Sequence, residues 1–202
     1  MSRPYADSGR TSQKRRTMDA LVAAARTLVA AGKTPTVDDA AQAAGVARST
    51  AYRYFPGQRE LLAAAHPETA RTSMLPDTPP QDAAGRLDAV VVEFTRMILE
   101  TEAQQRTMLR LSLESLDGPD RSLPLRQGRA IGWLTEALVP LRGEMTDQQI
   151  HKLVLAIRSA IGIEALVWLT DVGGLGREEA IESMRWTANA LLAKAQTAGL
   201  WS

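Results

Sequence analysis

The chain has 202 residues, a formal net charge of +1 and no cysteine. This length suffices for one large core or for a small domain joined to a larger one, and the lack of cysteine excludes a disulfide framework, a thiolate metal site and a thiol nucleophile. We find no signal-peptide segment and expect no membrane-spanning run, so we expect a cytoplasmic protein.

The charge is distributed unevenly along the chain. Residues 1–60 hold ten Lys/Arg against five Asp/Glu, a net of +5, whereas residues 61–202 hold fourteen against eighteen, a net of −4. A basic segment beside a mildly acidic body indicates that the N-terminal part meets a polyanion.

Apolar residues recur at helical spacing along the chain, and no stretch alternates apolar and polar residues between turn signals, so the pattern predicts an all-α protein. We expect a loose basic tail over residues 1–16, then a first helix that ends at Gly32. A short helix with Thr36 as its N-cap follows over 37–44 and ends at Gly45. Two more short helices are expected over 47–54 and 58–66, with Pro67 stopping the second.

The segment 67–81 is rich in proline and poor in apolar residues. It predicts a connector between an N-terminal domain over 1–66 and a larger helical domain over 82–202. In the larger domain we expect longer helices over 82–102, 103–116, 125–141, 147–170 and 177–197.

The stretch from Asp39 to Phe55, DAAQAAGVARSTAYRYF, has the form of a helix-turn-helix, in which the second helix enters the DNA major groove. Arginine can bind guanine O6 and N7 together, and hydroxyl groups can serve either kind of base edge. An ordinary capped surface helix and a solvated basic tail are the alternatives. The predicted DNA-binding residues are Thr36, Ala47, Arg48, Ser49, Thr50, Tyr52, Arg53, Tyr54, Gln58 and Arg59, with the basic run Lys14, Arg15 and Arg16.

The runs RRTMDALVAAARTLVAAG, TVDDAAQAAGV and ARSTAYRYFPGQRELL together resemble the DNA-binding domain of TetR-type transcriptional regulators. The resemblance covers about the first third of the chain. It implies a three-helix domain around the helix-turn-helix, a linking fourth helix, and a larger helical domain that binds a small effector and dimerises. Most such proteins are repressors that an effector releases from the operator.

The chain departs from this family's pattern at four positions. Gln58 stands where most relatives carry a lysine near a phosphate, so Arg59 is the alternative donor. Ala40 and Ala51 replace bulkier aliphatic residues, which predicts a thinly filled core. Asp38 occupies a position where some relatives contact a base, and a carboxylate there can accept only from cytosine N4.

An effector cavity should be apolar with a few fixed polar groups. The candidates are Phe94, Met97, Met108, Trp133 and Trp168, with Arg110 or Glu164 as the polar element, and for each a place in the core is the favoured alternative. Glu164 lies in an apolar stretch and needs a partner, either an arginine or a ligand.

The last two helices carry more apolar surface than we expect one chain to bury, which predicts a homodimer through a four-helix bundle. The predicted interface residues are Ile157, Ile161, Ile181, Met184, Ala188, Leu191 and Leu192.

No nucleophile, metal or phosphate-loop constellation is visible, and the two histidines, His66 and His151, stand apart without neighbouring ligands. We therefore expect no enzyme, no cofactor and no metal. The sequence predicts a homodimeric regulator that binds a double-stranded DNA operator and responds to a small-molecule effector, most simply as a repressor. An architectural DNA-binding protein without an effector and, less favoured, a helical enzyme are the alternatives.

Overall fold

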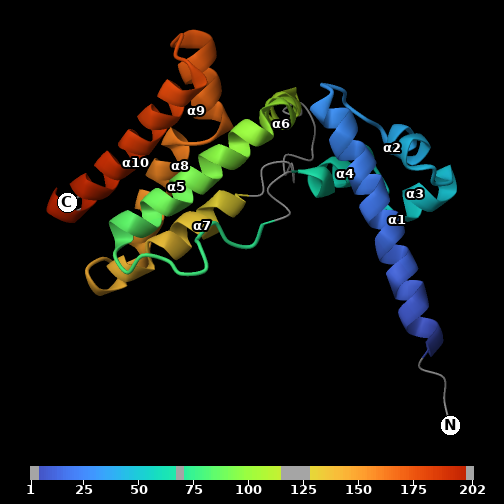
Figure 1. Ribbon diagram of the computed structural model, residues 1–202, viewed down its shortest axis with the longest axis horizontal. Coiled ribbons are helices and arrows are strands. Elements are labelled where there is room, and N and C mark those ends of the chain that lie inside the picture. The colour runs from blue at the N-terminus through green and yellow to red at the C-terminus, as the bar shows by residue number, and fades with distance from the viewer. Residues whose placement is uncertain (1–4, 67–70, 115–127, 199–202) are drawn as a thin grey trace. The chain divides into compact units, whose positions relative to one another are not determined.

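The computed structural model describes residues 5–66, 71–114 and 128–198, and all regular secondary structure in these ranges is helical (Figure 1). The prediction of an all-α chain is confirmed. The chain divides into two compact units, which we call unit 1 (residues 1–69 with 103–127) and unit 2 (residues 70–102 with 128–202).

Unit 1 is built around a long first helix. That helix packs against the second and fourth helices, and the second packs against the third. A helix from later in the chain also belongs to unit 1 from Ala103 onward. The helices of unit 1 are α1 (Tyr5–Ala30), α2 (Val37–Ala44), α3 (Arg48–Tyr54), α4 (Gln58–Ala65) and α6 (Glu102–Glu114).

The expectation of a loose tail over residues 1–16 is wrong, because α1 already begins at Tyr5. No proline occurs between Tyr5 and Pro35, and extending an existing helix fixes only one residue for each new hydrogen bond. A polar sequence can therefore continue a helix whose second half is held by packing. Gly32, at φ +75°, follows the end of α1, as its place in the sequence predicts.

The core of unit 1 consists largely of small side chains, in agreement with the predicted thin filling. Five of its nine fully buried members are alanines, and the larger ones come from four different segments. The cluster comprises Leu21, Ala25, Val37, Ala40, Ala41, Ala51, Phe55, Leu61 and Ala65.

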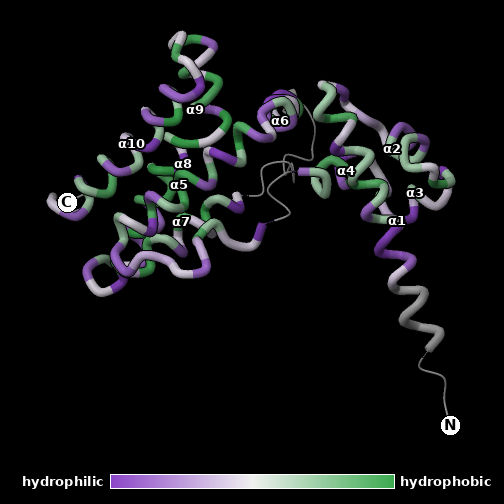
Figure 2. Tube along the Cα trace, viewed as in Figure 1, coloured by the Kyte–Doolittle hydropathy of each residue, from purple (hydrophilic) through white to green (hydrophobic). Residues whose placement is uncertain are grey.

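Unit 2 has four main helices in a ring, in which α5 packs on α7 and α10, and α8 packs on the same two. Figure 2 shows the hydrophobic stretches of α5 and α8 in green. The helices are α5 (Ala83–Glu100), α7 (Arg129–Ala137), η3 (Val139–Gly143), α8 (Asp147–Ala160), α9 (Ile163–Val167), η4 (Trp168–Val172) and α10 (Arg177–Ala198).

The helix expected over 147–170 is interrupted, so that prediction is wrong in one respect. Ile161 is extended at φ −128° and ψ 151°, and Gly162 has φ +121°, a conformation that ends α8 before α9 begins. Among the described residues one stretch, Asp147–Val172, is long and apolar enough to cross a membrane by length and composition. Core helices of soluble proteins pass the same test, and here Leu153, Val154 and Ile157 are buried within unit 2.

Two other expected helices run past the described ranges. The helix predicted over 103–116 matches α6 as far as Glu114, and its last residues lie outside the described part. The helix predicted over 125–141 is seen from Arg129, and it gives way to the 3-10 helix η3 around Pro140. Residues 71–81, the described part of the predicted connector, contain no helix.

Candidate nucleic-acid interface

The start of α2 is fixed by a reciprocal capping box. Thr36 Oγ1 accepts from Asp39 N at 3.1 Å, and Asp39 Oδ2 accepts from Thr36 N at 2.8 Å. Hydrogen bonds from the Thr36 side chain and backbone hold the pKa of the Asp39 carboxyl below its usual value. This box sets where α2 begins and therefore where the turn to α3 falls.

The turn between α2 and α3 depends on Gly45, which has φ +65° and ψ 29°. Its N–H and that of Val46 satisfy carbonyls at the end of α2, with Val46 N to Ala41 O at 2.9 Å. A side chain at position 45 would strain this left-handed backbone. The helix-turn-helix predicted from the sequence is present with this glycine as its pivot.

One face of α3 is buried and the opposite face is open. Ala51, and Phe55 just beyond the helix end, lie in the core of unit 1. The exposed positions recur at helical spacing and carry donors suited to phosphates and base edges; they are Arg48, Ser49, Tyr52 and Arg53, with Ala47 exposed at the N-cap. Thr50 and Tyr54 are half-buried, and Tyr54 packs against the core.

An ion pair that the sequence did not predict crosses the two helices of this motif. Arg48 Nη2 lies 2.7 Å from Asp38 Oδ2, and the Arg48 guanidinium carbon lies 5.8 Å from the centroid of the Tyr52 ring. The Arg48 side chain is 74% exposed and that of Asp38 38%. Only the close approach of the starts of α2 and α3 brings these side chains together.

The predicted DNA-binding residues outside α3 differ in exposure. Lys14, Arg15 and Arg16 are exposed on α1. Gln58 is half-buried, and its Nε2 donates to Thr34 O at 3.2 Å and Pro35 O at 2.9 Å. The Gln58 side chain therefore holds the loop before α2, and a phosphate contact from it would require these bonds to break. Arg59 is also half-buried.

The predicted effector residues are split between the two units. Phe94 and Trp133 meet edge to face in unit 2 at a centroid distance of 5.9 Å, and both are buried, as is Met97. Met108 and Arg110 lie on α6 in unit 1 instead. Met108 packs with Val29 and Leu62, and Arg110 Nη2 donates to Thr34 Oγ1 at 2.8 Å, so both hold α6 to the rest of unit 1.

Glu164 and Trp168 line a pocket of about 330 Å³ between the α8–α9 segment and α10. Of the two partners predicted for Glu164, an arginine or a ligand, the structure shows an arginine, because Arg158 Nη1 lies 3.2 Å from Glu164 Oε2. The same nitrogen donates to Ile161 O at 2.8 Å, and the guanidinium carbon lies 5.8 Å from the centroid of the Phe94 ring. Ser159, Ser183, Met184 and Thr187 also line the pocket.

The expectation that the last two helices cannot be buried by one chain is wrong for most of the residues named. Five of the seven predicted interface residues are buried inside unit 2, namely Ile157, Ile161, Met184, Ala188 and Leu192, and the other two, Ile181 and Leu191, are half-buried. The ring of four helices explains this result, because α10 packs against both α5 and α8. On the described part of α10 the exposed large apolar residue is Trp186, at 72%.

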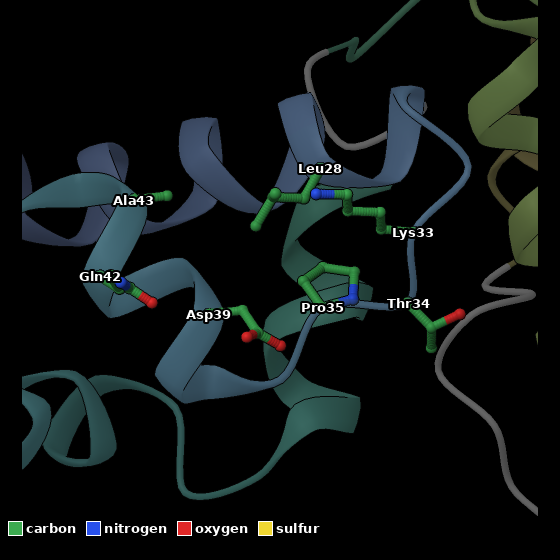
Figure 3. A pocket seen from close by; sticks show the side chains of 7 residues that line it. All are labelled: Leu28, Lys33, Thr34, Pro35, Asp39, Gln42 and Ala43. Carbon is green, nitrogen blue, oxygen red and sulfur yellow. The ribbon is translucent and has the colours of Figure 1, made fainter.

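A second pocket, of about 310 Å³, lies in unit 1 between the end of α1, the following loop and α2 (Figure 3). Leu28, Pro35 and Ala43 supply apolar surface, and Lys33 and Gln42 supply polar ends. Among the residues that the structure describes, no group of three or more His, Cys, Asp or Glu side chains could hold a metal ion.

Comparison with known proteins bears on the first domain and on the fold. Residues 17–65 match the family model described as bacterial regulatory proteins, tetR family. A search of curated proteins gave no match. The fold is similar to that of a TetR transcriptional regulator from Rhodococcus sp. RHA1, with 20% identity and a TM-score of 0.62 over 88% of this chain and 96% of that chain. Residues 17–65 therefore form a helix-turn-helix domain of the tetR family, and the chain shares its fold with a TetR transcriptional regulator.

Proposed function

We propose that the protein is a homodimeric, cytoplasmic repressor without catalytic activity, and that a small-molecule effector releases it from its operator. In this proposal residues 1–66 bind DNA, residues 67–81 connect, and residues 82–202 bind the effector and dimerise. The observation that carries the proposal is the pairing of a DNA-reading unit with a second unit that holds an open pocket of about 330 Å³.

The pocket supports effector binding over a purely architectural role. Its volume falls within the range of about 300–1,000 Å³ that small-molecule sites occupy. Glu164 and three hydroxyl-bearing side chains provide polar groups on an otherwise apolar lining. A fully packed second unit would instead have favoured a DNA-binding protein without an effector.

Effector control requires two states that the ligand binds with different affinity. The junction between α5 and α6 offers a covalent route, because α5 belongs to unit 2 and α6, from Ala103 onward, belongs to unit 1. Arg110 and Gln104 attach α6 to the DNA-reading unit, with Gln104 Nε2 donating to Arg26 O at 2.9 Å. A ligand that favours one placement of α5 would therefore favour, through α6, one placement of the helix-turn-helix in unit 1.

The outward face of α10 supports a homodimer. Ser183, Trp186, Ala190, Ala193 and Thr197 follow one another at intervals of four and three residues, which is the spacing of a helix-pairing seam. Small side chains on this seam allow close approach, and the 72% exposed Trp186 needs a partner surface. A twofold axis would bring two such seams together and place the two reading heads about 34–36 Å apart along DNA.

The dimer is tested by Trp186→Glu, with Val139→Glu on η3 as the control, since Val139 is 41% exposed and lies outside the seam. Sedimentation should show monomers for Trp186→Glu and dimers for Val139→Glu. The charge buried twice at the seam would cost several kcal/mol per dimer. A Trp186→Glu protein that still sediments as a dimer would move the interface to another face.

Repression is tested by transcription in vitro. The operator is first selected from a random-sequence duplex library with the full-length protein, then placed across a promoter. We expect added protein to lower transcript yield and a subset of a small-molecule library to restore it. The same compounds should quench the fluorescence of Trp168 in the wild type and lose this effect in a Glu164→Gln variant, which keeps the tryptophan reporter. A rise in transcript yield would identify an activator instead.

A further inference from the structure

The ion pair between Asp38 and Arg48 lies on the surface that faces DNA, and its position calls for a functional explanation. Arg48 is the first residue of α3, and Asp38 lies in the first turn of α2. The two side chains are 74% and 38% exposed. An ion pair with that exposure contributes at most about 1 kcal/mol to folding, so stability alone does not account for a carboxylate on a surface that must approach phosphates.

We propose that Asp38 is a specificity-determining positioning residue, which holds Arg48 for base reading and keeps it from binding phosphates without regard to sequence. The inference rests on the operator binding proposed above. It goes beyond that proposal by assigning the balance between specific and non-specific affinity to one carboxylate.

The geometry leaves Arg48 able to read a base while paired. Arg48 Nη2 lies 2.7 Å from Asp38 Oδ2 and carries two N–H bonds, so one N–H of Nη2 can pair with Asp38 while the other, together with a neighbouring N–H on Nη1 or Nε, faces the two acceptors of guanine. The Tyr52 ring, 5.8 Å from the guanidinium carbon, supports the same side chain from the α3 side. Two contacts from different helices thus restrict a side chain that would otherwise lose much rotamer freedom on binding.

The second oxygen of Asp38 adds to this argument. Asp38 Oδ1 is shielded from solvent and has no hydrogen-bond partner in the described structure. A buried carboxylate oxygen without a donor leaves the charge of Asp38 poorly compensated except through Arg48. Moving Arg48 away to a phosphate would therefore carry a cost, whereas a guanine within reach of the paired guanidinium would not require that movement.

The carboxylate also repels phosphates directly. Non-specific binding comes almost entirely from cations that neutralise phosphates, and each such contact steepens the dependence of log K on log salt by about 0.9. With Asp38 in place the pair contributes little net charge to that interaction. Removing the carboxylate should release one cation for the DNA backbone.

The test compares full-length wild type with Asp38→Asn, which removes the charge but keeps the shape. Asp19→Asn is the matched control, because Asp19 is an exposed aspartate on α1 outside the helix-turn-helix. Each protein selects duplexes from a random-sequence library. Its affinity is then measured for the enriched duplex, for single-base variants of that duplex and for a shuffled duplex over a range of KCl concentrations.

We expect the wild type to enrich a motif with one base pair that depends on Arg48. At that base pair Asp38→Asn should reduce discrimination by at least about fivefold, the lower end of what a bidentate arginine contact provides. Its affinity for the shuffled duplex should rise, with a salt slope steeper by up to about 0.9 and steeper than that of Asp19→Asn. In an Arg48→Ala background, Asp38→Asn should change neither the discrimination at that base pair nor the salt slope further, because no Arg48 cation remains to be released.

Arg48→Lys provides an independent variant if Asp38→Asn folds poorly. Lysine keeps the cation but cannot present two parallel donors, so discrimination at the same base pair should fall while the salt slope on shuffled DNA does not. Unchanged discrimination and slope in Asp38→Asn would overturn the inference while leaving operator binding intact. A new base preference that persists without Arg48 would also overturn it, because Asp38 would then touch a base itself. A wild type that enriches no motif would refute operator binding as well.

Discussion

Gly162 should be among the least replaceable residues of unit 2, and Gly162→Ala tests this. Its backbone at φ +121° and ψ −176° lies in a region that is essentially restricted to glycine. A Cβ atom there would meet Arg158 Nη1 at 2.5 Å and Glu164 Oε2 at 3.1 Å. The substitution therefore strains the backbone and separates the ion pair that joins the end of α8 to α9.

The magnitude follows from three contributions. Backbone strain in this region costs about 1–3 kcal/mol, and weakening the charged hydrogen bond from Arg158 to Ile161 O costs about 1–2 kcal/mol more. The lower entropy of an unfolded chain with alanine offsets roughly 0.4–1 kcal/mol. We expect Gly162→Ala to lower the free energy of unfolding of unit 2 by about 1–5 kcal/mol.

Urea unfolding followed by selective tryptophan excitation is the suitable assay, because all four tryptophans fall within residues 128–202 of unit 2. Gly132→Ala is the matched control, since a Cβ there meets nothing within 4 Å and position 132 is exposed within helix α7. In the control Gly132→Ala the free energy of unfolding should rise by about 0.5–1 kcal/mol. If Gly162→Ala were as stable as Gly132→Ala, the account of the α8–α9 break would be refuted.

Three further predictions concern both units. Ala43→Leu should place its side chain in the pocket of unit 1 beside Leu28 and stabilise that unit by about 0.5–2 kcal/mol. Tyrosine fluorescence can measure this, because all three tyrosines lie within residues 5–54, and a loss of stability would show that the pocket does not admit the side chain. Thr36→Ala should destabilise α2 by about 1 kcal/mol and raise the pKa of Asp39 toward its ordinary value, which carboxyl NMR titration can detect; an unchanged pKa would contradict the capping box. The Arg185 side chain lowers the pKa of Asp88, so their pairing should stabilise unit 2 above the unfolded pKa of about 3.9 and cease to do so as pH falls through the lower folded value. The stability difference between wild type and Asp88→Asn should therefore shrink in acid, and a pH-independent difference would exclude the carboxylate charge as its source.

The helix-turn-helix was predictable nearly to the residue because its boundaries are set by local chemistry. The expected helix over 37–44 coincides with α2, and those over 47–54 and 58–66 differ from α3 and α4 by one residue at an end. Thr36 caps α2, Gly45 forms the turn that follows it, and Pro56-Gly57 separates α3 from α4. These signals act within a few residues, so one sequence is enough to read them.

The break at Gly162 was missed because apolar residues continue at helical spacing on both sides of it. An isolated glycine in such a pattern does not distinguish a tolerated helical residue from a left-handed one. The prediction of a loose tail before α1 was wrong for a related reason, since polarity alone does not decide whether an established helix continues.

The predicted dimer residues show a different limit. Periodicity identifies the apolar face of a helix but not whether its own chain or a second copy covers that face. Met184 and Ala188 follow the same pattern as an interface would, and only the packing of α5 and α8 against α10 assigns them to the core. Trp186 lies among polar neighbours on the opposite side, where hydrophobic patterning gives little weight to a single aromatic residue.

In the helix-turn-helix of unit 1, the residues that stabilise the fold are different from those proposed to recognise DNA. Its stability depends on residues that never face DNA: the Thr36 capping box, the Gly45 turn and the burial of Ala51 and Phe55. Its proposed recognition surface consists of exposed side chains whose truncation removes little buried area. Substitutions on that surface should therefore change DNA affinity without unfolding the unit. The Asp38–Arg48 pair follows the same rule, because its exposure makes it weak for stability and its position makes it decisive for specificity.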